Sequence, residues 1–303
     1  MALAGGVGAA RFLTGLTKLV KDEDLSVIVN TGDDIELFGL HISPDLDIVA
    51  YTLAGIVDEE KGWGIRGDTF QCLEMLRKYG FDTWFALGDK DLATHIYRTD
   101  RLNQGAALSQ ITDEVCRSLG LKIKILPMTN DKFETRITTT EGTMHFEEYF
   151  VKKQAKDEVL GIEFVGAATP IPSPGVLEAI SKAERVVICP SNPVISIGAI
   201  LSVNGVKDAL KRTNAKVIGV SPIVAGLPIK GPADKMLRCL RVEVSAFGVA
   251  KLYSDFLDTI VIDTKDAGEK NRIEQLGIHV KVINTVMKSL EDKVALARAV
   301  LKD

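Results

Sequence analysis

Cysteine is scarce and scattered in this sequence of 303 residues. Its four cysteines, Cys72, Cys116, Cys189 and Cys239, form no CxxC pair, and that pair is the spacing that zinc ribbons and redox dithiols need. The pattern therefore indicates neither kind of site. Buried free thiols are typical of a reducing compartment, so we expect a cytoplasmic protein.

Long apolar runs and an excess of positive charge are also missing. No run approaches the roughly 20 apolar residues that cross a bilayer, and the first residues lack the basic region and hydrophobic stretch of a signal peptide. The net charge is -4 and the pI is near 5.7, which gives no general attraction to polyanions. We therefore expect neither a membrane nor a nucleic acid as partner. A local basic pocket for a phosphorylated small molecule is compatible with this balance.

What the sequence does contain is an alternation of short β-branched runs with amphipathic helical stretches. With 46% hydrophobic and 26% charged residues, a chain of this length can bury a substantial core. Strand-like runs separated by helices predict parallel strands joined by helical crossovers. We expect an α/β protein with a doubly wound, mostly parallel, Rossmann-like sheet in one domain, 1–303. The predicted strands are 25–29, 122–126, 185–189, 216–220, 259–262 and 280–283, after a very short first one at 1–4.

The middle of the chain has a different pattern. Residues 133–140 and 144–151 alternate around the turn Glu141-Gly142-Thr143, which predicts an antiparallel hairpin. A further strand is predicted at 159–165, and a helix begins near Val176. We interpret residues 131–168 as a β insertion or small lobe within the domain. The glycine-broken segment 58–101 predicts helices over the strand ends.

A glycine-rich turn joins the first predicted strand to the first predicted helix. Residues 4–11 read AGGVGAAR, and small residues there let backbone N–H groups and the helix dipole approach a phosphate or ribose. Gly6, Val7, Gly8 and Arg11 are therefore candidate binding residues. The third glycine of GxGxxG would fall at Arg11, and no GxxxxGK[ST] run exists, so a plain strand-to-helix turn is the alternative.

Acidic residues follow the second strand. Asp33 and Asp34 lie in a turn at the carboxyl end of the sheet, where they could face a hydroxyl or a metal, although an Asx-rich turn has the same composition. Ser43 then predicts a helix N-cap, and the DxD pair Asp45 and Asp47 suits Mg²⁺ with the oxygens of a diphosphate. Residues two apart on a helix diverge by about 200°. At most one of the pair is expected on the metal, and we favour Asp45.

Charged and polar segments continue along the chain. Residues 88–98 concentrate charge, and Lys90, His95 and Arg98 could bind phosphate, with a solvated helix face as the alternative. His41 and His145 are expected to be structural. Turns at the ends of later strands contain four further candidates that offer hydroxyl, amide and backbone groups: Ser191, Asn192, Ser221 and Pro222.

Taken in order, these segments resemble the motif series of the 2-phospho-L-lactate transferase family. The resemblance runs from residue 1 to the last predicted strand, and the ordered series is far more specific than any one member. It comprises residues 5–12 (GGVGAARF), 29–34 (VNTGDD), 42–47 (ISPDLD), 62–64 (GWG), 87–95 (LGDKDLATH), 190–193 (PSNP) and 220–223 (VSPI).

The resemblance implies a transferase of coenzyme F420 biosynthesis. Such an enzyme joins a phospholactyl group from lactyl-diphospho-guanosine to the deazaflavin alcohol Fo, releases GMP, uses Mg²⁺ and forms a homodimer. Some relatives use the enolpyruvyl analogue of the donor, so the resemblance leaves the donor open. Family members often have Arg where this chain has Lys90, which keeps the charge but not the bidentate fork.

The resemblance also implies roles for matching positions. It places the nucleotide over the glycine loop and the Ser-Asn-Pro and Ser-Pro turns, and Fo near Asp45 and residues 88–91. Asp45 and Asp47 are then the candidate metal ligands, Asp47 or Asp33 the orienting carboxylate or proton acceptor, and Lys90 the anion stabiliser. The remaining candidate substrate contacts are Asp34, Asp89, Asp91 and His95.

Two other functions compete with this prediction. A non-enzymatic regulator that binds a nucleotide sugar, like the gluconeogenesis-factor relatives, would need the loops without the chemistry. The acidic DxD pair and the segment 88–95 favour the transferase over it. A nicotinamide-dependent oxidoreductase is disfavoured because Arg11 replaces the third glycine of the dinucleotide motif.

Overall fold

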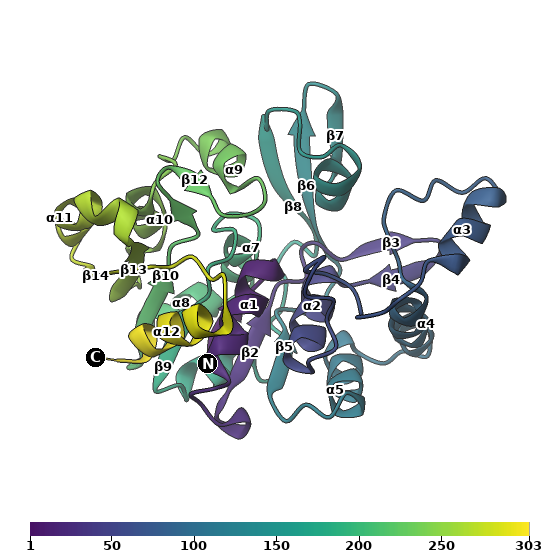
Figure 1. Cartoon of the computed structure of the whole chain (residues 1–303), viewed down its shortest axis with the longest axis horizontal. Helices are drawn as coiled ribbons and strands as arrows, with labels where there is room; N and C mark the ends of the chain where they lie inside the picture. The colour runs from purple at the N-terminus through teal and green to yellow at the C-terminus, as the bar shows by residue number, and fades with distance from the viewer. Residues whose placement is uncertain (303) are drawn as a thin grey trace.

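Seven parallel strands form the central sheet of the computed structural model, which describes residues 1–302 (Figure 1). The strand order is β14-β13-β10-β9-β1-β2-β5, and every pairing in it is parallel. All the strands predicted for this sheet are present, and the predicted fold class is confirmed. Their bounds are β1 Ala2–Ala4, β2 Ser26–Val29, β5 Lys124–Pro127, β9 Arg185–Ile188, β10 Lys216–Val220, β13 Thr259–Asp263 and β14 His279–Ile283.

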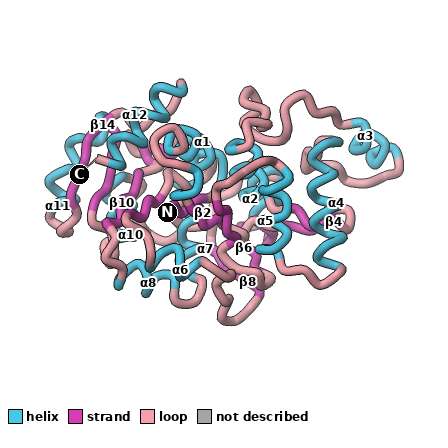
Figure 2. Tube along the Cα trace, turned by 90° about the horizontal axis from the view of Figure 1, so that it is seen from below, coloured by secondary structure: helices cyan, strands magenta, loops and turns pink. Residues whose placement is uncertain are grey.

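Helices cover both faces of this sheet. Successive side chains of a strand point to opposite faces, and the core divides accordingly. Val27 and Val29 pack with the helices of one face, while Ile28 packs with those of the other. Figure 2 shows α1, α2 and α12 on one side of the strands and α6, α7 and α8 on the other. The first group comprises α1 Gly6–Leu16, α2 Pro44–Leu53, α5 Leu108–Ser118 and α12 Leu290–Leu301; the second includes α6 Val176–Ser181, α7 Ile197–Ser202, α8 Val206–Arg212, α9 Ala233–Cys239, α10 Ala246–Tyr253 and α11 Lys270–Glu274.

The strand order reverses between β1 and β9. From β1 the chain proceeds to β2 and β5 on one side, and it later adds β9, β10, β13 and β14 on the other. The loops after β1 and β9 therefore leave the sheet in opposite directions. In doubly wound sheets a ligand binds in the crevice that such a switch point opens at the carboxyl ends of the strands.

A three-stranded antiparallel sheet, β7-β6-β8, occupies the predicted β insertion. It consists of β6 Phe133–Thr139, β7 Gly142–His145 and β8 Gly161–Gly166, and we call residues 133–166 the lobe. The predicted second hairpin strand, 144–151, was wrong beyond His145, because residues 148–152 form a short π-helix. Phe146 and Tyr149 are both buried, and Phe146 stacks on Phe150 at 5.5 Å. This three-and-four spacing is helical, and the alternation seen in the sequence concealed it.

The glycine-broken segment 58–101 contains helices, as predicted. They are α3 Gln71–Lys78 and α4 Asp89–Asn103. They lie beside the hairpin of β3 Ile35–Leu37 and β4 Leu40–Ile42, beyond the β5 edge of the sheet rather than over the strand ends (Figure 1). Within residues 1–302, no helix is both long and apolar enough to cross a membrane.

Candidate active site

The loops after β1 and β9 meet at the switch point. The Gly5 amide donates a hydrogen bond to Ser191 Oγ at 3.1 Å. A Cβ on Gly8 would collide with the carbonyl oxygen of Pro190, and one on Gly5 would lie 2.6 Å from Ser196 Cβ. Gly8 is therefore needed because two backbones approach each other closely, and Gly5 because the Ser196 side chain packs against it.

Helix α1 opens onto this crevice with an uncapped first turn. Gly5, at the N-cap, has no side chain to accept a bond, and the first turn contains no acidic residue. The first N–H groups of a helix have no intrahelical partner, so those of Val7 and Gly8 are available to an anion.

The polar residues predicted at later strand ends shape their own turns. Asn192 Oδ1 accepts hydrogen bonds from the amides two and three residues ahead, at 3.0 and 3.3 Å. Ser221 Oγ accepts from the Ile223 amide and donates to the Ile223 carbonyl, and the Pro222 carbonyl accepts from the Ile229 amide. These residues hold the rim of the crevice in a fixed conformation.

Four buried acids lie beside the glycine loop, and we call them the carboxylate cluster. Its members are Asp33, Asp34, Asp45 and Glu147, which are between 4 and 8% exposed. Asn30 Nδ2 donates to Asp45 Oδ2 at 2.9 Å and thereby connects the loop after β2 to the start of α2. Three members were predicted from the sequence, whereas Glu147 was missed because it lay inside the misassigned strand.

The pKa values of three acids in the carboxylate cluster are raised. Burial, and then repulsion from Asp45 and Glu147, hold the pKa of Asp33 well above its usual range. Burial raises the pKa of Asp45 to about 7, opposed by the Asn30 hydrogen bond and favoured by the Asp34 charge. Burial and the charges of Asp45 and Asp34 raise the pKa of Glu147 to about 8. Acids placed this way favour a bound cation or proton.

Two fully buried oxygens of the cluster have no partner among the described residues. Asp34 Oδ2 accepts from Ser43 Oγ at 2.7 Å and lies 3.0 Å from His41 Nε2, but Asp34 Oδ1 is buried and unpaired, and so is Asp33 Oδ1. Ser43 stands at the predicted N-cap of α2 but gives its hydroxyl to Asp34 instead of capping. Unpaired buried carboxylate oxygens fit a hard divalent cation such as Mg²⁺, which takes oxygen ligands.

The lobe is attached directly to this cluster. The Thr135 amide donates to the Gly32 carbonyl at 2.6 Å, and His145 Nε2 lies 3.0 Å from the Asp34 carbonyl oxygen. A side chain on Gly32 would lie 2.8 Å from the Thr135 hydroxyl. These contacts bring Glu147, two residues after His145, to the loop after β2.

Asp47 belongs to a separate buried network between α2 and α4. Arg98 bonds both Asp47 oxygens, and one of these contacts is 3.1 Å. His95 lies 3.7 Å from Asp47 and 3.4 Å from Asp91, which also accepts from Tyr51 at 2.8 Å. Ligand atoms of Asp47, Asp91 and His95 lie within 4.8 Å of one another, as a metal would need. Because Arg98 already occupies Asp47, the network is better explained as a charge-paired connection between two helices.

Asp89 and Lys90 have structural partners as well. Asp89 accepts from the amides of Gln71 and Cys72 at the start of α3, at 3.1 and 3.0 Å, and Asp68 accepts from the Lys90 amide at the start of α4. Asp89, at the start of α4, thus caps α3, and Asp68, shortly before α3, caps α4. Lys90 Nζ donates to the carbonyls of residues 66 and 67 at 3.2 and 3.1 Å.

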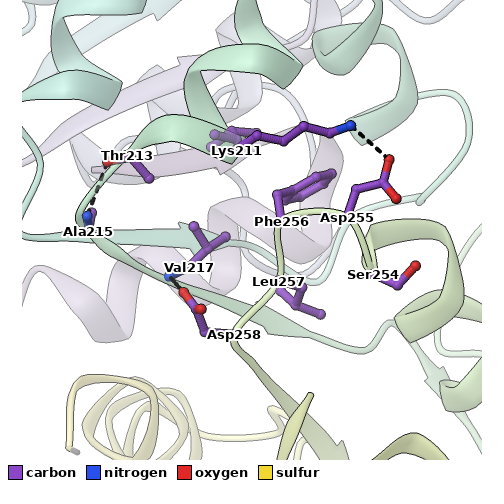
Figure 3. A pocket seen from close by; sticks show the side chains of 10 residues that line it. Lys211, Thr213, Ala215, Val217, Ser254, Asp255, Phe256, Leu257 and Asp258 are labelled. Atoms are coloured by element: carbon purple, nitrogen blue, oxygen red, sulfur yellow. Dashed lines mark hydrogen bonds and ion pairs between the residues drawn. The ribbon is translucent and has the colours of Figure 1, made fainter. Parts of the chain in front are cut away.

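A cavity of about 260 Å³ lies on the side of the sheet where the strands begin, between α8 and the start of β13 (Figure 3). Its polar groups are paired: Lys211 lies 3.1 Å from Asp255, and Asp258 accepts from the Val217 amide at 2.7 Å. It lies at the amino ends of β10 and β13, away from the switch point. We therefore place the active site at the switch point and not in this cavity.

The fold and this arrangement define an α/β protein with its ligand site at the switch point of a doubly wound sheet. The sequence matches the family described as 2-phospho-L-lactate transferase CofD over residues 1–295. The chain belongs to that family and is a transferase. The resemblance found in the sequence is confirmed, and the regulator and oxidoreductase alternatives are not favoured.

Curated relatives cover nearly the whole chain. A phosphoenolpyruvate transferase of Streptomyces griseus is 46% identical over 306 residues, covering 99% of this chain and 96% of that protein. A 2-phospho-L-lactate transferase of Methanosarcina mazei is 40% identical over 299 residues, covering 99% and 98%. A crystal structure of a UPF0052 family member from Bacillus halodurans shares the fold with a TM-score of 0.64, at 16% identity and 99% and 98% coverage.

Proposed function

We propose that this transferase moves a 2-phospholactyl or phosphoenolpyruvyl group from a guanosine diphospho-donor to the hydroxyl of the deazaflavin Fo. The products are GMP and the core of coenzyme F420. The observation that carries the proposal is the carboxylate cluster beside the uncapped first turn of α1, at the switch point. It would provide acidic ligands for a cation beside backbone donors for phosphate, and transfer from a diphosphate uses both.

The reaction balances as a displacement at phosphorus. The Fo hydroxyl oxygen forms a bond to the phosphorus that carries the lactyl or enolpyruvyl oxygen, and the bond from that phosphorus to the bridging oxygen of the diphosphate breaks. GMP takes the electron pair, and the hydroxyl proton passes to a carboxylate or to water. Bound Mg²⁺ would neutralise charge on the diphosphate.

Roles within the cluster follow from the contacts. We assign Asp45 to the metal, because it borders the Gly6 amide and is oriented by Asn30. Asp33 and Asp34, each with an unpaired oxygen, complete the oxygen ligands or orient the Fo hydroxyl, with Asp33 as the candidate proton acceptor. We assign Asp47 to positioning α2 through Arg98 rather than to the metal.

A Mg²⁺-dependent assay tests this function. Fo is supplied with the lactyl donor and, separately, with the enolpyruvyl donor, while GMP release and the coupled product are followed by mass spectrometry. Product from either donor should vanish with EDTA and fall at least about 100-fold in Asp45→Ala, whereas Asp24→Ala, at an exposed acid before the amino end of β2, should match the wild type. No product from either donor, together with no retention of Fo, would leave a nucleotide-sugar-binding regulator as the better account.

We also propose that the enzyme works as a cytoplasmic homodimer. Free cysteines support a reducing compartment, and the family resemblance suggests the dimer. Light scattering coupled to gel filtration tests it, and a single peak at the monomer mass of 32.9 kDa would contradict it.

A further inference from the structure

Two cations near the glycine loop have no counter-ion within residues 1–302. Arg11 lies on α1 one turn beyond Val7, and Lys230 lies on the loop after β12 Leu227–Pro228. Among residues 1–302, neither side chain takes part in a hydrogen bond or an ion pair. Lys230 was not among the residues predicted from the sequence.

Lys230 and the glycine loop both lie beside Gly62. A Cβ on Gly62 would lie 3.6 Å from Lys230 Nζ and 3.7 Å from a methyl carbon of Val7. The ammonium group, the first turn of α1 and residue 62 therefore meet at one place. Partial burial, and then the positive charge of Arg11, lower the pKa of Lys230. The two like charges are close enough to repel each other, and neither has a counter-ion within residues 1–302.

The loop that carries Lys230 is fixed by its own hydrogen bonds. Asp266 accepts from the Ala225 amide with both oxygens, at 2.9 and 3.2 Å. Ala225 has a φ of +51° at the tip of the hairpin formed by β11 Ile223–Val224 and β12. The Ile229 amide then donates to the Pro222 carbonyl at 3.3 Å. The backbone that carries Lys230 is therefore held in place by the fold.

We infer that Arg11 and Lys230 bind the diphosphate of the donor over the first turn of α1. The identity of the donor rests on the proposed function, whereas the anion site rests on these contacts. The carboxylate cluster lies on the Gly6 side of the turn, and the two cations lie on the side of Val7. The charges on the two sides of the turn therefore orient the donor. Its diphosphate lies between the two cations and the acids of the carboxylate cluster.

The test measures binding without catalysis. GDP is titrated into the full chain by calorimetry, with the fluorescence of Trp63, next to Gly62, as a second readout. Lys230→Ala and Arg11→Ala should each weaken GDP binding at least about tenfold, the loss of one charge-assisted contact. Lys230→Arg should retain most of the affinity. Lys251→Ala, which removes an exposed unpaired lysine on α10, is the matched control and should bind like the wild type.

The same variants separate an anion contact from a structural role. Inorganic pyrophosphate should displace GDP from the wild type, and the two alanine variants should lose this competition while keeping the melting temperature of the wild type. Lys230→Met keeps the aliphatic stem and should behave like Lys230→Ala. GDP affinity unchanged within twofold in both alanine variants, or no binding of GDP by the wild type, would overturn the inference.

The outcome does not depend on the transfer assay. A chain that binds GDP through Lys230 but transfers nothing would refute the proposed function and keep the anion site. A chain that makes product while both variants bind GDP normally would refute the anion site alone.

Discussion

Glu147 and Asp45 show how one buried acid changes the behaviour of its neighbour. In the folded protein their pKa values are about 8 and about 7, against ordinary values of 4.5 and 3.8. Between pH 4 and 8 the folded state therefore holds more protons than the unfolded state. Stability contributed by these groups is present below pH 4 and is lost as the pH rises toward 8.

This difference predicts a pH dependence in metal-free protein. With EDTA present, the free energy of unfolding should fall as the pH rises from 5.5 to 8. At pH 8, Glu147→Gln should raise the free energy of unfolding by on the order of 1 to 3 kcal/mol, because one pKa unit is worth about 1.4 kcal/mol. Urea denaturation at both pH values measures it. Glu184→Gln, at an exposed acid, is the control. A Glu147→Gln protein that is less stable than the wild type at pH 8 would contradict this account of the cluster.

At the scale of secondary-structure elements, α2 depends on α4 through one buried ion pair. Arg98→Ala removes the bidentate partner of the buried Asp47 carboxylate, which should cost about 3 to 5 kcal/mol of stability. Arg98→Lys should recover only part of this, since it lacks the fork that bonds both oxygens. Arg117→Ala breaks an exposed pair with Asp113 on α5 and should cost less than about 1 kcal/mol. Equal losses in the two alanine variants, measured by denaturation, would refute the role of the network.

The approach of the β1 and β9 loops makes a second prediction for elements. A methyl group in Gly8→Ala would push the start of α1 away from Pro190. We expect GDP affinity and transfer to fall at least about tenfold, because the backbone donors of the first turn move. Gly268→Ala adds a methyl group where nothing lies within 4 Å and should leave both unchanged. Wild-type affinity in Gly8→Ala would show that the loops can separate without harm.

Across the whole molecule, the sequence predicted what depends on local pattern. The buried runs Val-Ile-Val of β2 and Thr-Ile-Val-Ile of β13 identify strands because both of their faces are apolar. The glycine loop, Asp33 and Asp34 were predicted from their positions after strands, and Asp45 was predicted from the DxD spacing at the start of a helix.

The remainder depends on contacts between distant segments. Glu147 joins the cluster only because the lobe bonds Gly32 and Asp34. Asp47 was expected at a metal, but its environment is set by Arg98, 51 residues away on another helix. Lys230 meets the glycine loop across more than 200 residues of sequence. No local spacing contains this information.

The switch point also determines the order in which the molecule can be completed during synthesis. Strand β1 is synthesised before every other strand of the central sheet, and it pairs on one edge with β2, which follows soon afterward. Its other edge has to wait for β9, about 180 residues later, and the same wait delays the hydrogen bond from Gly5 to Ser191. Unpaired strand edges invite association with other chains. Until β9 emerges, the nascent protein therefore has only β1, β2 and β5 of the central sheet. One edge of β1 is unpaired, and the residues that complete the active site are missing.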